Sequence, residues 1–176
     1  MDDIVIIDNF LSDEELEKCS SAKTYSDYFW RIQRSTVADD NSVKDNPYAK
    51  DFDVTFLSKN LMDNEYYTSY LFNKIKKTFN QNYKLNDVYL NLHESLRDGA
   101  FHTDQDADRT VILYITDWYP AWGGFTHLMK SPMEHNIIAP IPKRLLNFKS
   151  DIVHKAYSYC NQNCPGRITV AFKLGL

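Results

Sequence analysis

The run AFHTDQD, residues 100–106, places a histidine and an aspartate two positions apart. In a strand, residues i and i+2 point to the same side with Cα atoms about 6.5–7 Å apart, so an imidazole and a carboxylate at this spacing can bind one metal ion. His102 and Asp104 meet this condition, although such a pair also occurs as an ordinary surface hydrogen bond. Asp106 and Asp108 continue the alternation, but in an extended strand they would lie roughly 13 and 20 Å from His102. We therefore interpret them as a solvated turn.

A metal site needs a third protein ligand, and the chain offers four further histidines: His93, His127, His135 and His154. His154 lies in the strand-like run SDIVHKAYSY, about fifty residues after Asp104 and just before the last predicted strand. Two histidines and one carboxylate form the facial triad of non-haem Fe(II) oxygenases, which leaves coordination positions open. We predict that His102, Asp104 and His154 bind the metal. His93 and His127 are interpreted as hydrogen-bonded side chains within strands, and His135 as part of a turn.

The elements that must position these residues begin with a short apolar strand at residues 4–7. Ser12 and Glu15 have the spacing of a capping box, which predicts a helix start there, and the apolar side of that helix is formed by Leu11, Leu16 and Cys19. FWRIQRSTV, residues 29–37, alternates like a strand. The polar segment 38–53 is predicted to be a long loop and a candidate lid. Residues 64–80 form the clearest helical pattern, with an apolar residue every four positions: Tyr67, Leu71, Ile75 and Phe79.

After residue 85 the helical pattern gives way to short runs bounded by Gly, Pro, Asn or Asp: VYLNLHE, AFHTD, TVILYIT, GFTHLM, NIIAPI, RLLNF, IVHKAYSY and RITVAFKL. Many short strands with turn signals between them are typical of an antiparallel barrel or jelly roll. The chain contains no internal repeat or linker, so we predict one domain over 1–176, with an N-terminal strand and helices in 1–85 and a β core in 86–176.

Composition narrows the classes of function. A hydrophobic content of 43% in 176 residues is enough for a single buried core. The net charge of −4, with no basic block, argues against general nucleic-acid binding. We find neither a signal peptide nor an apolar run of membrane-spanning length. Three cysteines (Cys19, Cys160 and Cys164) without a secretory signal suggest reduced thiols. The expected location is the cytoplasm.

The C-terminal run PGRITVAFKLGL completes a pattern. Arg167 and Thr169 are two apart on one face of a strand, thirteen residues after His154. The order H-x-D, distal His, then R-x-T resembles the Fe(II)/2-oxoglutarate-dependent dioxygenases, most closely their prolyl 4-hydroxylase-like branch. RTVILYITDWYPAWGGFTHL and IVIIDNFLSDEELEKC also resemble stretches of that family. The resemblance is firmest over residues 89–174. It implies a mainly β chain with flanking α-helices around a double-stranded β-helix core, a jelly-roll, cupin-like fold.

The resemblance also assigns roles. His102, Asp104 and His154 would be the Fe(II) ligands, and Arg167 would pair with the distal carboxylate of 2-oxoglutarate, for which a planar guanidinium is suited. Thr169 and Tyr114 would contact the same carboxylate. Family members often carry a Tyr about ten residues before the first His, where this chain has Leu92. Asn91 and Tyr89 are the candidates to replace it. Taken singly, Tyr114 would be a core residue, and Gly123 with Gly124 an ordinary hairpin turn.

The implied reaction is oxidative decarboxylation of 2-oxoglutarate by O₂ to succinate and CO₂, coupled to hydroxylation of a substrate, with ascorbate allowed as an accessory reductant. The branch favours a prolyl residue in a peptide or protein. Aromatic side chains at Trp118, Tyr119 and Trp122 could grip such a substrate or could plug the barrel end. Three alternatives stay open: an oxygenase acting on a small molecule or a nucleobase, a zinc enzyme of similar fold, and a non-catalytic β-helix module that binds a sugar or peptide. The oligomeric state is not predicted.

Overall fold

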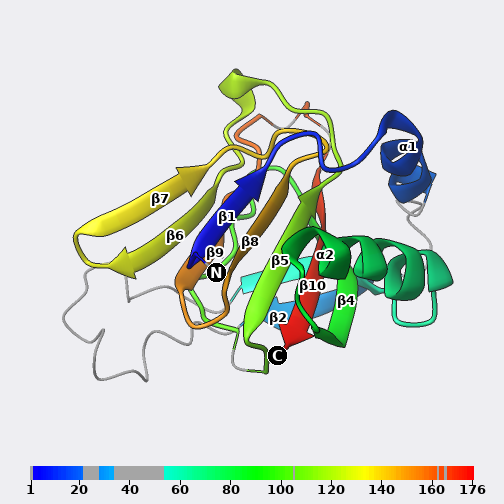
Figure 1. The fold of residues 1–176 in the computed structure, drawn as a ribbon. Coiled ribbons are helices and arrows are strands. Elements are labelled where there is room, and N and C mark those ends of the chain that lie inside the picture. The colour runs from blue at the N-terminus through cyan, green and yellow to red at the C-terminus, as the bar shows by residue number, and fades with distance from the viewer. Residues whose placement is uncertain (1, 22–27, 34–53, 105, 162, 165) are drawn as a thin grey trace.

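The computed structural model describes residues 2–21, 28–33, 54–104, 106–161, 163–164 and 166–176 (Figure 1). The candidate lid at 38–53 lies outside them. The elements in chain order are β1 (Ile4–Ile7), α1 (Asp13–Ser21), β2 (Phe29–Gln33), β3 (Val54–Asn60), a π-helical segment (Tyr66–Leu71), α2 (Phe72–Phe79), β4 (Lys84–His93), β5 (Arg109–Tyr114), a 3₁₀ turn (Pro120–Trp122), β6 (Thr126–Ser131), β7 (Glu134–Ile138), β8 (Leu145–Lys149), β9 (Val153–Ala156) and β10 (Arg167–Gly175).

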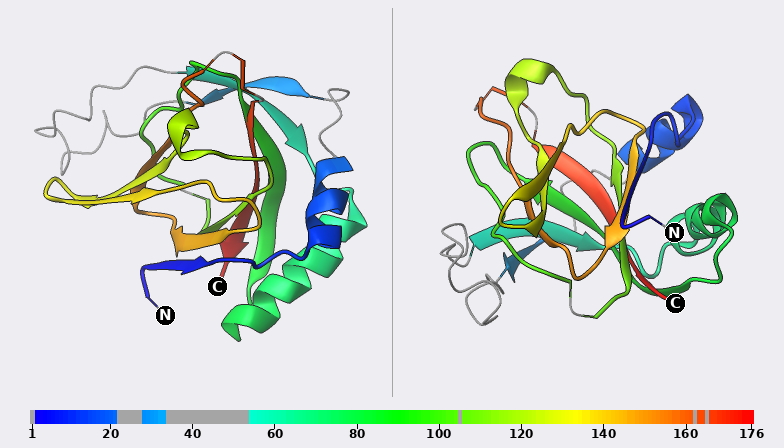
Figure 2. Two further views of the ribbon diagram at one scale, coloured as in Figure 1. Left: turned by 90° about the horizontal axis from the view of Figure 1, so that it is seen from above. Right: turned by 60° about the vertical axis from the view of Figure 1, so that its left-hand side comes forward.

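Two antiparallel sheets form the body of the protein. The larger has seven strands in the order β1-β8-β5-β10-β4-β3-β2, and the smaller has three in the order β7-β6-β9. Figure 2 shows the helices on one side of the large sheet and the small sheet on the other. The prediction of a mainly β chain with flanking helices is confirmed. Among the described residues, no helix is long and apolar enough to cross a membrane.

Alternate side chains of β10 point in opposite directions, one set into the apolar core under the helices and the other into the space between the two sheets. On β10, Ile168, Val170, Phe172 and Leu174 are buried in the main apolar core. The same core holds Tyr67, Leu71 and Ile75 of the helical segment, so the helices cover the outer face of the large sheet. Complete burial of one such aliphatic or aromatic side chain contributes about 1.5–3 kcal/mol. The intervening β10 residues therefore face the other way, into the space between the two sheets.

The N-terminal helix is fixed as its sequence indicates. The backbone N–H of Ser12 donates to Glu15 Oε2 at 2.7 Å, and the backbone N–H of Glu15 donates to Ser12 Oγ at 3.2 Å, which is the predicted capping box. Glu15 also accepts hydrogen bonds from Tyr70 Oη at 2.8 Å and Lys74 Nζ at 2.6 Å. One carboxylate thus ties α1 to the second helical segment.

Several predicted elements differ in the structure. The expected helix over 64–80 begins as a π-helix, and only Phe72–Phe79 is α-helical. AFHTD is no strand: His102 makes a single antiparallel bridge with His154. β3 was not anticipated. His135 lies in β7 and not in a turn, because Met129–Ser131 of β6 pairs with the start of that strand.

The two glycines after the 3₁₀ turn do not form a hairpin, which corrects that interpretation. β5 pairs with β8 and β10, whereas β6 pairs with β7 and β9, so the connection between β5 and β6 crosses from one sheet to the other. Gly123 and Gly124 adopt φ values of +70° and +76° in this crossing. A Cβ on Gly124 would lie 2.5 Å from the ring of Tyr159, so a larger residue does not fit there.

Candidate functional site

A cavity of about 540 Å³ lies between the two sheets. Its floor is formed by the inward-facing residues of β4 and β10, and its small-sheet wall by Thr126, His154 and Ala156. The rest of the space between the sheets is filled by an apolar cluster of Tyr114, Leu128, Ile138, Leu146, Phe148 and Ile152. The sandwich is therefore hollow on one side and packed on the other.

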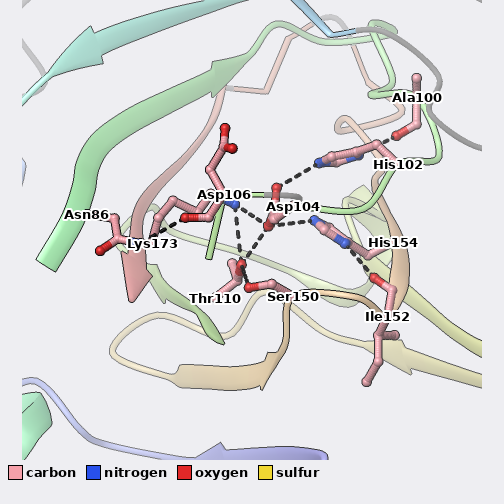
Figure 3. A network of polar contacts seen from close by, with 10 residues as sticks. All are labelled: Asn86, Ala100, His102, Asp104, Asp106, Thr110, Ser150, Ile152, His154 and Lys173. Atoms are coloured by element: carbon pink, nitrogen blue, oxygen red, sulfur yellow. Dashed lines mark hydrogen bonds and ion pairs between the residues drawn. The ribbon is translucent and has the colours of Figure 1, made fainter. Parts of the chain in front are cut away.

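The three predicted metal ligands meet at this cavity (Figure 3). The ligand atoms of His102, Asp104 and His154 all lie within 4.8 Å of one another. The backbone bridge brings the histidines together, because the N–H of each donates to the carbonyl of the other at 3.0 and 2.8 Å. The Nδ1–H groups of His102 and His154 donate to the carbonyls of Ala100 and Ile152, each at 2.9 Å. Both rings thus present Nε2 to the aspartate, as metal-ligating histidines do.

The aspartate between them is held by several donors. Asp104 Oδ1 is 3.6 Å from His102 Nε2, and Oδ2 is 3.4 Å from His154 Nε2. Oδ2 also accepts a hydrogen bond from Thr110 Oγ1 at 2.5 Å and contacts Lys173 Nζ. Burial alone would raise the pKa of the Asp104 carboxyl, but the interactions that oppose it, of which the charge of Lys173 is the largest, hold the pKa well below its ordinary value. The carboxylate is therefore ionised.

His102, the first of the three predicted ligands in the sequence, is neutral. Burial, and then the neighbouring His154, lowers the pKa of His102 to about 3. A neutral imidazole can donate its Nε2 lone pair to a metal without first losing a proton. Two imidazoles and a carboxylate with open positions are the donor set of a facial-triad Fe(II) site, so these residues fit that ion.

Arg167 is the most deeply buried charge in the floor of the cavity, with 1% of its surface exposed. Its Nε donates to Gly124 O and its Nη2 to Thr126 Oγ1, each at 2.8 Å, and the guanidinium lies 5.5 Å from the centre of the Tyr114 ring. Among the described residues it has no carboxylate partner. A buried charge with neutral partners alone is costly. An anionic ligand in the cavity would offset that cost.

The other two predicted cosubstrate residues lie beside Arg167. Thr169 is buried, lines the cavity, and is paired in register with Tyr114 of β5 and Asn91 of β4. Tyr114 is set further back: its hydroxyl is 2.7 Å from Thr126 Oγ1, the same oxygen that accepts from Arg167. The structure therefore brings Arg167, Thr169 and Thr126 to the cavity surface, with Tyr114 behind Thr126. Thr126 was not predicted from the sequence.

The departure at Leu92 has a simple geometric explanation. Leu92 is buried in the core under the helices, on the face of β4 opposite the cavity. Its neighbours Asn91 and His93, together with Tyr89, face the cavity. His93 is paired in register with Arg167 and stacks on Phe56 with ring centres 5.0 Å apart. Burial, and then the charge of Arg167, lowers its pKa to about 3, so His93 is a neutral wall of the cavity.

The aromatic turn does not lie at the mouth of the cavity. Trp118, Tyr119 and Trp122 are absent from the lining of the cavity among the described residues. Trp118 Nε1 donates to Gly123 O at 2.8 Å, and the Trp122 ring lies 5.4 Å from that of Tyr159. The turn therefore packs against Gly123 and Tyr159, while Tyr119 stays 61% exposed. The aromatic walls of the cavity are Phe56 and Tyr89 instead.

No family model matches the sequence, and no curated protein matches it. The structure, however, is similar to a 2OG-Fe(II) oxygenase family oxidoreductase from Burkholderia pseudomallei, with a TM-score of 0.72 and 9% identity over 98% of this chain and 85% of that one. A Pseudomonas putida prolyl-4-hydroxylase gives a TM-score of 0.66 and 12% identity over 98% and 92% of the two chains.

A prolyl hydroxylase from Trichoplax adhaerens, in complex with a hypoxia inducible factor peptide fragment, gives a TM-score of 0.63 and 16% identity over 98% and 83% of the two chains. At these identities the likeness is one of fold. The chain has the double-stranded β-helix fold of the 2-oxoglutarate/Fe(II) oxygenases, and the resemblance indicated by its motifs is confirmed at that level.

Proposed function

We propose that this protein is an Fe(II)- and 2-oxoglutarate-dependent oxygenase that hydroxylates its substrate with release of succinate and CO₂. The observation that carries the proposal is the composition of one cavity. It holds a His-Asp-His cluster of ionised carboxylate and inward Nε2 atoms, and also a buried guanidinium without a carboxylate partner among the described residues. A metal-binding group and an unpaired cation in one cavity fit a ligand that chelates a metal and carries a second carboxylate.

Each residue has a defined task in this proposal. His102, Asp104 and His154 would hold Fe(II), which when bound supplies the activation of O₂ and the oxidative decarboxylation. Arg167 binds the distal carboxylate of 2-oxoglutarate, and Thr169 adds a hydroxyl donor. Thr126 orients the guanidinium, and Tyr114 in turn orients Thr126. Tyr114 thus acts on the carboxylate through a neighbour.

The substrate that we propose is a prolyl residue in a peptide or protein. The pattern over residues 89–174 supports it, as do two structural neighbours that are described as prolyl hydroxylases, one of them with a bound peptide. A proline ring is rigid and apolar, and Phe56 and Tyr89 give the cavity flat apolar surface for it. The alternative is oxygenation of a small molecule or a nucleobase, because enzymes of one fold can act on different substrates. A succinate-release assay distinguishes the two.

A succinate-release assay tests the proposal. Protein purified without oxygen is loaded with Fe(II) and given 2-oxoglutarate and O₂, with proline-containing peptides, free amino acids or nucleotides as substrates. We expect succinate above the background of the Asp104→Asn variant, which retains the cavity but lacks the ionised ligand. Activity that needs Zn²⁺ in place of Fe(II), or binding of neither 2-oxoglutarate nor metal, would instead support the zinc enzyme or the non-catalytic module.

A further inference from the structure

Lys173 contacts the predicted metal-ligand cluster, but no role was predicted for it from the sequence. Its Nζ contacts Asp104 Oδ2 and lies 3.4 Å from Thr110 Oγ1 (Figure 3). Only 13% of its side chain is exposed, and the ammonium lies 5.8 Å from the centre of the Tyr89 ring. A buried lysine that faces a predicted metal ligand carries a positive charge where a divalent cation is expected to bind. The presence of a lysine cation so close to the expected metal ion requires a physical explanation.

The sheet explains how Lys173 reaches the cluster. Arg167, Thr169, Ala171 and Lys173 alternate along β10 and all line the cavity. In register, Lys173 is paired with Thr110 of β5, the other residue that donates to Asp104. Arg167 lies six residues away on the same face, so the strand places one cation beside the predicted carboxylate pocket and the other beside the aspartate.

The two donors act on the same oxygen of the aspartate. Thr110 Oγ1 donates to Asp104 Oδ2, and Thr110 is itself held 3.0 Å from Ser150 Oγ. With the lysine ammonium added, Oδ2 contacts two protein donors and lies 3.4 Å from His154 Nε2, whereas Oδ1 lies 3.6 Å from His102 Nε2 and receives neither donor. The two carboxylate oxygens are thus made unequal by the protein.

We propose that Lys173 is a positioning residue that, together with Thr110, retains Oδ2 of Asp104, so that the aspartate offers the metal Oδ1 alone. The inference rests on the proposed function. Its benefit is the number of open positions: on a six-coordinate ion, two histidines and one carboxylate oxygen leave three, two for a 2-oxo acid chelate and one for O₂, whereas a carboxylate that binds through both oxygens leaves only two. Lys173 therefore keeps the third position open beside the cosubstrate, although its charge opposes that of the cation.

The test compares Lys173→Met with wild type, using Co(II) as a redox-stable probe under argon. Three quantities are measured: Co(II) affinity by competition with a chromogenic chelator, the visible spectrum of the Co(II) protein, and 2-oxoglutarate affinity of the Co(II) protein by calorimetry. We expect the spectrum to change before any 2-oxo acid is added. Loss of a residue that orients a metal ligand costs roughly 10- to 100-fold in metal affinity or activity. Because the two positions left beside a bidentate Asp104 admit the chelate in one orientation only, we expect a loss of this order in 2-oxoglutarate affinity. Co(II) affinity should change by less than about tenfold, because the three ligands remain and one repelling charge is gone.

Two further variants separate positioning from a role in folding. Lys173→Arg keeps a cationic donor and should restore the wild-type spectrum. Thr110→Val removes the other donor to Oδ2 and should shift the spectrum in the same direction as Lys173→Met, which keeps the test open if that variant does not fold. Lys149→Met is the matched control, since that lysine is half-exposed at the end of β8 and pairs with Asp3.

The outcomes are distinct. A wild-type spectrum and wild-type 2-oxoglutarate affinity in Lys173→Met would overturn the inference. So would equal losses of Co(II) and 2-oxoglutarate affinity with an unchanged spectrum at saturation, because that is the result for a lysine that only supports folding. If the wild-type Co(II) protein binds no 2-oxoglutarate, the proposed function fails, whereas the spectra of the variants still decide whether Lys173 retains Oδ2.

Discussion

Removal of the Arg167 side chain should weaken 2-oxoglutarate binding without removing the metal. The guanidinium is fully enclosed and donates hydrogen bonds to Gly124 O and Thr126 Oγ1, neither of which belongs to the His-Asp-His cluster. Truncating a buried charged donor that pairs with a ligand carboxylate typically costs about 2–5 kcal/mol. Arg167→Ala should therefore raise the Kd for 2-oxoglutarate by roughly two to three orders of magnitude.

The assay is a titration of the Co(II)-loaded protein with 2-oxoglutarate, and it includes a ligand that lacks the group in question. 2-Oxopentanoate has a methyl group where 2-oxoglutarate has its distal carboxylate. If Arg167 binds that carboxylate, the affinity for 2-oxopentanoate should be low in the wild type and nearly unchanged in Arg167→Ala. Arg144→Ala is the control, because Arg144 pairs with Asp8 at the surface, with Nε 2.6 Å from Oδ1.

Two results would refute this reasoning. The first is wild-type affinity for 2-oxoglutarate in Arg167→Ala, which would leave the buried cation without a role in ligand binding. The second is an equal loss for both ligands, which would mean that the substitution collapses the cavity floor rather than removing one charge pair. Arg167→Lys should recover only part of the affinity, since a lysine ammonium lacks the planar fork that matches a carboxylate.

Three further predictions concern the metal ligands, the substrate and Glu15 of the N-terminal helix. His102→Ala and His154→Ala should each abolish metal binding in equilibrium dialysis at neutral pH, whereas His127→Ala, on β6 outside the cluster, should keep it; full occupancy in the first two would sink the ligand assignment. Proline-containing peptides should stimulate succinate formation and gain one oxygen on proline by mass spectrometry, and stimulation by nucleotides or free amino acids alone would contradict the proposed substrate. Burial raises the pKa of Glu15, but the hydrogen bond and charge of Lys74 help to bring it below 4.5, so its stabilisation is present above pH 4.5 and is lost as the pH falls through the folded-state value. Glu15→Gln should therefore lower Tm at pH 7 and flatten the fall of Tm in acid, and parallel Tm curves for the two proteins would count against that role.

Much of the fold could be predicted from short-range signals. The capping box at Ser12 and Glu15 involves residues three apart, and its hydrogen bonds are local, so the sequence contains all of the information. The strands of 86–176 were visible for the same reason, because alternation and turn residues are local. The start of the second helix as a π-helix, and the unpredicted strand β3, depend on tertiary packing against β4 and the core, which no local pattern contains.

The structure brings His102, Asp104 and His154 together, as the metal-site prediction requires, but not for the reason that the prediction gave. His102 and Asp104 were expected to converge because they share a face of a strand, whereas the segment is no strand and makes a single β-bridge, from His102 to His154. Lys173 was missed, although the alternation Arg167, Thr169, Ala171, Lys173 would have placed it on the cavity face. The alternation is visible in the sequence. That Lys173 would meet Asp104, however, depends on the pairing of β5 with β10, which brings Thr110 and the cluster to the far end of β10.

β10 is the middle strand of the seven-stranded sheet and comes after every other strand in the chain. During synthesis on the ribosome, β4 and β5 are therefore complete while the strand that joins them has not yet emerged. Each then presents an unpaired edge, the kind of surface that invites pairing with another chain. The pairings that close the gap join residues far apart in sequence, and such pairings form slowly. A nascent chain of this protein passes through a stage in which His102, Asp104 and His154 have been synthesised but the β10 part of their cavity floor has not.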